Sequence, residues 1–581
     1  MRIMRTGCSL GAGVALALGF AQGAAAAVTW WAVDPMAETK FMPDEPPPGG
    51  LKGEPVRIIA AQDEYEPGSF VLTADEDLGK VEFRVGDLKA ADGATFSARE
   101  LDLKTVKVWY QNQNAWYSYF ADDTLKLCPE LLLNDEDLVK VDEKKVANYA
   151  RLTEPDGKTT YHWLTSPKQV ENRIEDAGWK RIDDAFCSMK PNFMDAPKHA
   201  GATIEKGRHK QFFLTAHAAK DAKPGLYTGE IELYAKGAKV GAVPVSLRIL
   251  PFALPRPCTY FDCRKEFFVW FCSYIGYDGV MDVNGGDREL ATRQLRAICI
   301  DFAKHNQIIP DFSFDGLDEV AKEYGLDLKH RGYGGMLLSH NKAEMRFSAR
   351  RTHDRAAQAA GEPVEGYVSW GDEYSLNTLR RIRDMVQAYQ EEGLRFTVNS
   401  TSGYAAAGYL ADLWWPPTFP DANSKAKAEH FNALGGDNYF GWYACHHVGV
   451  ENPAFIRRQY GMGAYRAGLS CHYNYAHHLQ GWNDVSQEIY RPMMFVYGVG
   501  NGCLDTLQWE GFREGMDDIR YATKLQQLAQ PLARSMDNLK ARYAAKKALQ
   551  FLADLDGDDY DLTTTRLEMI RHILKLMEVS K

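Results

Sequence analysis

The sequence pattern changes at one proline-rich segment, and this change limits the folds open to the chain. Before Leu250-Pro-Phe-Ala-Leu-Pro-Arg-Pro257, short runs that alternate apolar and polar residues are separated by Gly and Pro. After it, apolar runs alternate with amphipathic stretches of helical period. Repeated proline continues neither a sheet nor a helix, so we interpret the segment as a linker between two architectures. At 581 residues the chain is also too long for a single hydrophobic core.

The part before the linker has the spacing of an all-β fold. Its alternating runs are Val56–Ala60, Phe70–Thr73, Val81–Val85, Val106–Tyr110, Gln211–Thr215, Gly229–Tyr234 and Val243–Leu250. Short strands at such spacing predict a β-sandwich over residues 28–256. The stretch from Asn112 to about Lys206 lacks this periodicity. We interpret it as a long ordered insertion that leans over the neighbouring domain, since structureless loops of this length are rare.

After the linker, strand and helix patterns alternate. The apolar runs are Phe267–Phe271, Ile308–Phe314, Tyr367–Trp370, Leu394–Val398, Leu413–Trp415, Asn438–Tyr443, Leu469–Tyr475 and Leu504–Trp509, and Gly335–Leu338 and Met494–Val496 could also be strands. Helical stretches such as Glu289–His305 and Leu376–Glu392 lie between them. This alternation predicts a TIM-like (β/α)8 barrel over residues 257–514. A helical region over residues 515–581 completes the expected multi-domain fold.

The N-terminus has the features of a secretory signal peptide. Two arginines precede an apolar run over residues 10–20, and Ala24–Ala27 offers a cleavage site of small residues. We therefore expect residues 1–27 to be removed and the protein to be exported to the periplasm or the cell exterior. The run is too short to span a bilayer, and no later segment reaches the roughly 20 apolar residues that a span needs.

Charge and composition narrow the class of partner. Removal of residues 1–27 changes the formal net charge from −10 to −12, because it takes away two arginines and no acid. A basic surface for nucleic acid is therefore disfavoured. The aromatic share of 12% slightly favours a carbohydrate ligand. Flat rings with a polar edge pack well on sugar faces, although they also suit ordinary cores.

Neither cysteine nor histidine spacing predicts a metal or another cofactor. Nine cysteines remain after residue 27, which leaves at least one thiol unpaired within the chain, and no Cys-x-x-Cys pair occurs. The neighbours His446-His447 and His477-His478 would point apart on regular structure.

Asp372 and Glu373 stand side by side where a predicted strand gives way to a predicted helix. In β/α architectures catalytic groups collect at this turn, because strand ends are rigid while the loops that follow can vary. The alternative is a cap, since acids just before a helix satisfy its free N–H groups and oppose its dipole. Local sequence alone favours the cap, so the decision depends on the rest of the chain.

Two further motifs resemble a known bacterial family. Ile59-Ala-Ala-Gln-Asp-Glu-Tyr-Glu-Pro67 resembles the early motif of the family called domain of unknown function 4091, and Trp509-Glu-Gly-Phe-Arg-Glu-Gly-Met-Asp-Asp518 closely resembles its late motif. That family is similar to glycoside hydrolase family 123, whose members carry an N-terminal β-sandwich and a β/α barrel. The resemblance covers about residues 50–530. It implies that Asp372 and Glu373 match a catalytic Asp-Glu pair, although the relatives usually continue Asp-Glu-Pro and this chain has Tyr374.

The activity implied by the resemblance is retaining removal of β-linked N-acetylgalactosamine with assistance from the substrate. The acetamido carbonyl of the sugar attacks the anomeric carbon, so the protein supplies no nucleophile. By analogy, Asp372 orients the acetamido group and stabilises the cyclic intermediate, and Glu373 is the general acid and then the base. Repulsion between adjacent carboxylates would help one of them to keep the proton that the acid step requires.

Seven further residues are candidates for substrate contact. Aromatic residues at predicted strand ends could form a sugar platform, or could equally belong to the core: Trp415, Trp442, Tyr443, Tyr475 and Trp509. Asn399 could hydrogen-bond a hydroxyl group, and Arg264 could clamp a hydroxyl or carboxylate unless it forms a structural ion pair. In the late motif we expect Arg513 and Glu514 to brace the last helix, and Asp517 and Asp518 to begin it.

Three functions stay open at this point. The first is an exported β-N-acetylhexosaminidase-like glycoside hydrolase. The second is a hydrolase of acidic or sulfated polysaccharides, in which the adjacent pair would need another carboxylate such as Asp437 or Asp505. The third is a non-catalytic glycan-binding envelope protein. Each takes a carbohydrate partner and needs no cofactor, and the sequence does not predict the oligomeric state.

Overall fold

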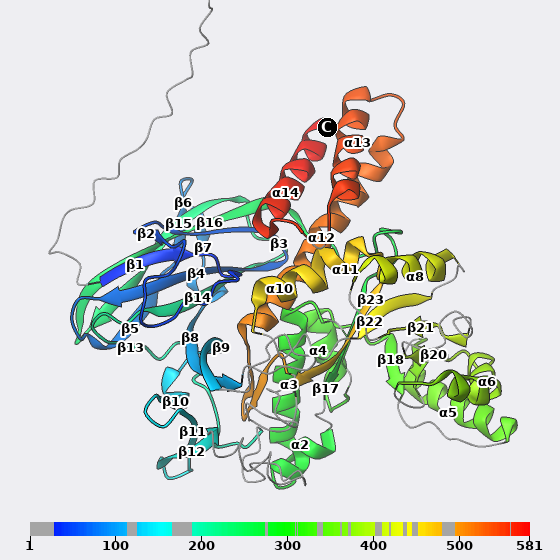
Figure 1. Ribbon diagram of the computed structural model, residues 1–581, viewed down its shortest axis with the longest axis horizontal. Coiled ribbons are helices and arrows are strands. Elements are labelled where there is room, and N and C mark those ends of the chain that lie inside the picture. Colours follow the sequence, from blue (N-terminus) through cyan, green and yellow to red (C-terminus); the bar gives the residue numbers. More distant parts are fainter. Residues whose placement is uncertain are drawn as a thin grey trace, which may run out of the picture.

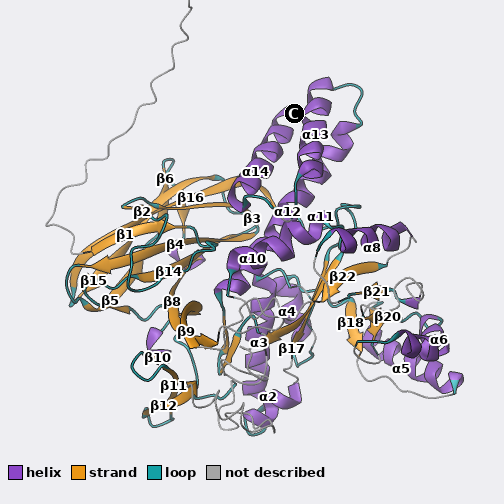
Figure 2. Ribbon diagram, viewed as in Figure 1, coloured by secondary structure: helices purple, strands orange, loops and turns teal. Residues whose placement is uncertain are grey.

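The computed structural model describes most of the chain after residue 27. The described residues are 28–112, 125–165, 189–273, 277–307, 309–310, 312–333, 341–360, 363–369, 373–400, 410–416, 420–433, 438–443, 451–478, 494–557 and 559–580. They form two large, mainly antiparallel sheets, a parallel sheet with helices, and a set of long C-terminal helices (Figures 1 and 2). No helix among these residues is long and apolar enough to cross a membrane.

Two sheets occupy the N-terminal part; all their strand pairs are antiparallel except β3 with β16, which pair in parallel. The first has the order β2 (Leu51–Lys52), β1 (Val28–Val33), β4 (Glu64–Ala74), β14 (Lys210–Ala218), β8 (Leu101–Asn112) and β9 (Leu125–Leu133). The second has the order β13 (Ala202–Ile204), β5 (Gly79–Val85), β15 (Gly225–Ala235), β16 (Ala238–Ala253) and β3 (Val56–Gln62), with β6 (Leu88–Ala90) and β7 (Thr95–Phe96) at its side. Each of the seven predicted N-terminal runs lies within one of these strands, so their assignment is confirmed.

One apolar core joins the two sheets. Phe70 of β4 and Phe212 of β14 stack with ring centroids 5.1 Å apart, and Phe83 from the facing sheet lies 4.6 Å from Phe212. Alternate residues of both sheets are buried against each other in this way, as the period of two requires. The strand β16 continues to Ala253, past the expected start of the linker, and its register against β3 shifts after Ile249. The shift accommodates Pro251, which has no N–H group for a regular ladder.

The stretch between Asn112 and Lys206 is ordered where it is described. It supplies β9, β13 and a small sheet of β10 (Val139–Asp142), β11 (Ala147–Thr153) and β12 (Thr159–Thr165). Glu130 of β9 accepts hydrogen bonds from Trp109, from Gln111 and, at 3.2 Å, from the hydroxyl of Tyr497 far along the chain. The prediction of an ordered insertion that leans on a later part of the chain is therefore confirmed for these residues.

A seven-stranded parallel sheet follows the linker. Its order is β17 (Phe268–Ser273), β23 (Cys471–His478), β22 (Tyr439–Tyr443), β21 (Leu413–Trp414), β20 (Arg395–Val398), β19 (Glu365–Val368) and β18 (His330–Tyr333). Helices between these strands are α2 (Tyr277–Val283), α3 (Arg288–Lys304), α4 (Leu317–Tyr324), α5 (Lys342–Ala360), α6 (Leu376–Gln390), α8 (Ala422–Ala433), α10 (Pro453–Arg458) and α11 (Ala464–Arg466). The predicted alternation of strand and helix is thus present.

The predicted runs match this sheet unevenly. Six of them overlap a strand, but Leu504–Trp509 does not form one: β25 (Gly502–Leu504) ends there and α12 (Leu507–Ala533) begins. The short strand β24 (Tyr497–Val499) follows Met494–Val496 instead of including it. No strand is formed by the described residues of Ile308–Phe314, and β18 is not predicted by the sequence. Residues 335–338 lie outside the described residues.

The parallel sheet curls so that its distant strands approach each other. Trp270 of β17 and Tyr367 of β19 are separated by four intervening strands, yet their ring centroids lie 6.4 Å apart. A flat sheet with strands about 4.8 Å apart would hold these rings more than about 20 Å from each other. The inner face therefore encloses a small apolar cluster, while the outer face packs against the helices.

The C-terminal helices begin earlier than the sequence suggests. The helix α12 starts at Leu507, with Thr506 accepting the N–H of Trp509, so Asp517 and Asp518 lie in its interior and do not begin it. The helices α13 (Leu539–Asp554) and α14 (Leu562–Val579) follow. Figure 1 shows α12 running between the N-terminal sheets and the parallel sheet.

Buried ion pairs connect α12 and α14 to the first sheet. Arg566 of α14 contacts Glu66 of β4 at 2.9 Å, and Glu514 and Asp518 of α12 at 2.5 and 2.6 Å. The Tyr521 hydroxyl of α12 donates to Glu64 of β4 at 2.8 Å. The early and late motifs therefore meet in space. Glu514 braces the last helix as predicted, whereas Arg513 pairs with Glu510 of its own helix.

This network, which we call the buried ion network, shifts pKa values in both directions. Burial raises the pKa of the Glu64 carboxyl to about 8, and the nearby Asp517 carboxylate adds to the effect. Burial also opposes ionisation of Asp518, but attraction by Arg457 and Arg566 outweighs it and lowers the pKa of Asp518 below its usual value. Glu64 therefore tends to keep its proton near neutral pH, while Asp518 stays ionised.

Arg566→Met should destabilise the protein strongly. The change leaves the carboxylates of Glu66, Glu514 and Asp518 without their shared cation, and breaking a buried pair typically costs about 3–5 kcal/mol. Urea unfolding measures the loss. Arg571→Met is the matched control on the same helix, because the pair of Arg571 with Glu568 is exposed and its loss should change the free energy of unfolding by less than about 0.5 kcal/mol. Equal losses in the two variants would contradict the role of the network.

Glu64→Gln should change how stability depends on pH. A carboxyl whose pKa is raised to about 8 in the folded state contributes stability below its unfolded pKa, and that stability is lost as pH rises through the folded value. The wild type should therefore lose stability relative to Glu64→Gln between about pH 5 and about pH 8, by about 1.4 kcal/mol for each pH unit that separates the folded and unfolded pKa values. Thermal unfolding across this range measures the difference, and parallel curves would show that Glu64 does not titrate in the folded protein.

Candidate active site

Glu373 lies in the loop between β19 and α6, at the carboxyl edge of the parallel sheet. Its side chain is exposed, and no ion pair to its carboxylate is present among the described residues. Its backbone has φ = 47°, in the left-handed region that side-chain-bearing residues seldom adopt. Such strain is concentrated at functional sites, where the surrounding structure holds it in place. Asp372 lies outside the described residues.

Another residue caps the helix that follows. The N-cap of α6 is Ser375, whose hydroxyl accepts the N–H of Thr378 at 3.1 Å. Glu373 stands two residues before this cap and is turned away from the helical path by its positive φ. The capping interpretation is therefore wrong for Glu373, whose carboxylate stays available for other contacts.

Residues at the ends of the neighbouring strands form hydrogen bonds to the backbone of the Glu373 loop. The Asn399 side chain, which follows β20, accepts the backbone N–H of Glu373 at 3.3 Å. Ser400 donates to the carbonyl of Tyr374, and the indole N–H of Trp414 donates to the carbonyl of Ser400 at 3.1 Å. Asn399 was expected to bind a substrate hydroxyl, but it is 9% exposed and the contact seen is with the loop backbone. Its observed role is to position Glu373.

Aromatic rings line the inner face of the curled sheet. Trp415 stacks on Tyr473 of β23 with centroids 4.3 Å apart, and Tyr443 lies 5.8 Å from the same ring. Trp270 of β17 meets Trp415 edge-on at 6.0 Å. Of the predicted platform residues, Trp415 and Tyr443 thus belong to the inner cluster. Trp415 is only 4% exposed, so Tyr443 and Tyr473, which are partly buried, present more ring surface.

Trp442 and Trp509 face away from this inner cluster. Side chains alternate between the two faces along β22, so the Trp442 ring points to the outer face of the sheet. There it packs on Tyr460 with ring centroids 4.8 Å apart, and its indole N–H donates to His472. Trp509 lies in the first turn of α12, is fully buried, and donates to Asp301 at 3.0 Å. Neither ring is accessible to a sugar, which removes both residues from the platform.

Two remaining predicted residues are not brought to the Glu373 loop. Arg264 precedes β17, at the opposite edge of the sheet from Glu373, and its guanidinium binds both oxygens of Asp262 at 2.9 and 3.0 Å. It forms the structural ion pair and does not serve as a clamp. Tyr475 belongs to β23, but its side chain lies outside the described residues.

Sequence reasoning missed Trp270 and Tyr473 as members of the inner cluster. Tyr473 follows Cys471 by two residues, so strand alternation alone puts both on one face. Deeper in the cluster, burial raises the pKa values of the Tyr367 and Tyr439 hydroxyls. Both hydroxyls are therefore neutral and act as dipoles, not as acids or bases, at ordinary pH.

The fold is shared with a known enzyme. The chain superposes with a TM-score of 0.56 on a family 123 glycoside hydrolase from Clostridium perfringens, described in a study of glycolipid glycan hydrolysis. The alignment covers 90% of this chain and 93% of that one, at 12% sequence identity. A family 20 exo-β-N-acetylglucosaminidase from Vibrio harveyi aligns over 90% of this chain and 98% of its own at 7% identity, but its TM-score of 0.21 supports no argument. No protein-family model and no curated protein sequence matches the chain.

Glu373→Gly should stabilise the protein. A left-handed backbone costs a side-chain-bearing residue roughly 1–2 kcal/mol, and glycine removes this cost while losing up to about 1 kcal/mol through greater freedom of the unfolded chain. We expect a net gain of about 0.5–1 kcal/mol in urea unfolding. Glu373→Ala is the control, because it also removes the carboxylate but keeps the strain. Equal stability of the two variants would show that Glu373 is not strained.

Proposed function

We propose that this chain is an exported retaining glycoside hydrolase that removes β-linked 2-acetamido sugars, with N-acetylgalactosamine as its first candidate substrate. The observation that carries the proposal is the exposed, strained and non-capping Glu373 at the carboxyl edge of a curled parallel sheet. The fold shared with a family 123 glycoside hydrolase supports it. Export rests on the signal-like pattern of residues 1–27 alone.

A closed eight-stranded barrel is part of this proposal. The inner cluster includes Ile309, which is 1% exposed, together with residues of β19, β21, β22 and β23. We infer that the barrel closes between β17 and β18, where Ile309 joins the inner cluster. The two N-terminal sheets, which share one core, would form the β-sandwich that precedes it.

The reaction would divide between the substrate and two acids. The acetamido oxygen attacks the anomeric carbon while Glu373 gives its proton to the departing glycosidic oxygen. Asp372 accepts the N–H of the acetamido group and offsets the positive charge of the cyclic oxazolinium intermediate. Water then attacks the anomeric carbon and gives a proton to Glu373, which returns the enzyme to its first state. Two inversions at one carbon leave the configuration retained.

The surroundings of Glu373 fit this division of roles. Asn399 holds the backbone of Glu373, and therefore the direction of its carboxylate, without engaging the carboxylate itself. A general acid must be positioned so that its proton reaches the glycosidic oxygen, and an ion-pair partner for its carboxylate is not required. The partly buried rings of Tyr443 and Tyr473 would face the apolar side of the sugar.

The polysaccharide alternative lacks a supporting observation. Asp437 lies outside the described residues, and Asp505 gathers with Asp301 and His305 on the side of the N-terminal sheets. Asp372 and Glu373 therefore remain the only acids assigned to the proposed reaction.

Glu373→Gln should reduce kcat by about 10²–10⁴-fold on an unactivated N-acetylgalactosaminide, since the variant cannot transfer a proton. The matched control is Glu365→Gln, because Glu365 begins the same strand at the opposite edge, where it contacts Arg395 at 3.3 Å. The control should retain its turnover. A loss of less than about tenfold in Glu373→Gln would remove Glu373 from proton transfer.

A panel of chromogenic β-glycosides distinguishes the open functions. Release from N-acetylgalactosaminide or N-acetylglucosaminide, inhibited by a thiazoline mimic of the cyclic intermediate, is the expected result. Release only from sugars without the acetamido group would favour the polysaccharide alternative. Sugar binding without release, unchanged in Asp372→Asn and Glu373→Gln, would favour a binding protein.

A further inference from the structure

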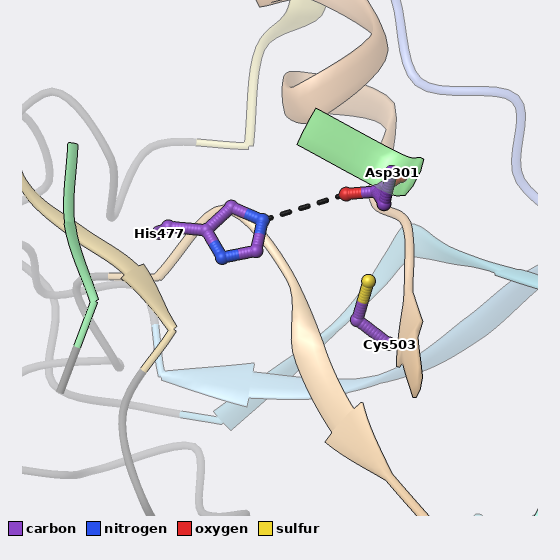
Figure 3. Close-up of side chains that lie close together, drawn as sticks. All are labelled: Asp301, His477 and Cys503. Atoms are coloured by element: carbon purple, nitrogen blue, oxygen red, sulfur yellow. Dashed lines mark ion pairs between the residues drawn. The ribbon is translucent and has the colours of Figure 1, made fainter. Parts of the chain in front are cut away.

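Three side chains of metal-binding type meet at one point away from Glu373. Asp301 comes from α3, His477 from the end of β23 and Cys503 from β25, and their ligand atoms all lie within 4.8 Å of one another. Figure 3 shows Asp301 directed at the imidazole of His477, with the Cys503 sulfur pointing toward Asp301. Cys503 is a free thiol. Carboxylate, imidazole and thiolate together form a donor set that suits Zn²⁺ and excludes Ca²⁺ or Mg²⁺.

The spacing of two of these ligands matches a shared ion. The Asp301 Oδ2 atom lies 3.4 Å from Nε2 of His477. This distance exceeds the roughly 2.7–3.2 Å of a good N–H···O hydrogen bond. Two ligands at about 2.0–2.1 Å from a tetrahedral Zn²⁺ lie about 3.4 Å apart. The pair is therefore spaced as two zinc ligands are, with Cys503 on the third side.

Residues of the late motif hold Asp301 in this position. The indole N–H of Trp509 donates to Oδ2 of Asp301 at 3.0 Å, and Nδ1 of His305 lies 3.0 Å from Oδ1. Nε2 of His305 in turn lies 3.5 Å from Glu510. Groups that orient a ligating carboxylate in this way are a regular part of protein metal sites. Trp509 and Glu510 are both buried in the first turn of α12, where they face this cluster.

A neighbouring group of Asp301, His305 and Asp505 is a weaker candidate. Nδ1 of His305 is already engaged by the carboxylate and the backbone carbonyl of Asp301, both at 3.0 Å. His305 orients Asp301 through Nδ1, which leaves only Nε2 available to an ion. The thiolate of Cys503 also offers a stronger bond to zinc than a second carboxylate does.

The three-residue cluster is open on one side. Asp301 and Cys503 line a cavity of about 1010 Å³ between the N-terminal sheets and the α3–α12 region. None of the residues that line it belongs to β18–β22 or to the loops after those strands, so it is separate from the Glu373 loop. An ion can enter from this cavity, and a water molecule from it can complete the coordination.

The geometry points to a zinc site formed by Asp301, His477 and Cys503, with one position left for solvent. On binding, the Cys503 thiol gives its proton to water and the thiolate bonds to the ion. Three protein ligands and an open position resemble a reactive zinc site more than a closed structural one. The site is independent of the proposed hydrolase function, because it shares no residue with the Glu373 loop.

Cobalt titration of the full-length mature protein tests the site. After treatment with a chelator, Co²⁺ should bind with one equivalent per chain and give the near-ultraviolet thiolate-to-cobalt band, and Zn²⁺ should displace it. Cys503→Ser should abolish the band. Cys263→Ser is the control, because the Cys263 thiol donates to Gln530 in another part of the protein and should leave the band unchanged. Absence of the band, or a band that persists in Cys503→Ser, would overturn the proposal.

Two further measurements do not depend on the stability of Cys503→Ser. In the wild type, Zn²⁺ should slow alkylation of Cys503 by about tenfold or more, as read by mass spectrometry of its peptide, because the bound thiolate is not free to react. Trp509→Phe replaces the indole by a phenyl ring without an N–H donor to Asp301, and it should weaken Zn²⁺ affinity by about 10–100-fold. Alkylation at the same rate with and without Zn²⁺ would also overturn the proposal.

Discussion

The contact between Arg566 and Glu66 connects the last helix of the chain to its fourth strand, and the arrangement of the sheets depends on it. Charges buried at this depth are costly unless each finds a partner, and Arg566 serves Glu66, Glu514 and Asp518 together. Tyr521 and Glu64 extend the same network by a hydrogen bond. Because Arg566 reaches Glu66 and Glu514 only when β4, α12 and α14 are in place, the network favours one relative placement of the first sheet and these two helices.

The carboxyl edge of the parallel sheet carries the Glu373 loop. Asn399, Ser400 and Trp414 form a supporting layer beneath the Glu373 loop, so the strained backbone is held by strand ends and not by the loop itself. The same α12 that contributes Glu514 and Asp518 to the network presents Trp509 and Glu510 to the Asp301 cluster. One helix thus links the ion network, the packing of the sheets and the candidate metal site.

Much of this was predictable from local pattern, and the exceptions have physical causes. Strand alternation located the N-terminal strands and six strands of the parallel sheet, and Glu373 was correctly predicted to lie between a strand and a helix. The pattern could not say which of Trp442 and Tyr443 faces inward, because adjacent residues alternate and only the tertiary fold chooses the face. Trp509 was misassigned although Trp509, Phe512, Met516 and Ile519 recur at helical spacing. The Asp301, His477 and Cys503 cluster contains residues from three elements that are far apart in the sequence, and no spacing motif predicts that they lie close together.

The distance in sequence between Glu66 and Arg566 has a consequence for biosynthesis. The two N-terminal sheets contain nearly all of their own core and can fold while translation continues. Arg566, however, lies 500 positions after Glu66, so Glu66 cannot form this pair until α14 has been synthesised. A chain that stops before α14 would therefore leave the Glu66 carboxyl of β4 without Arg566 as its partner.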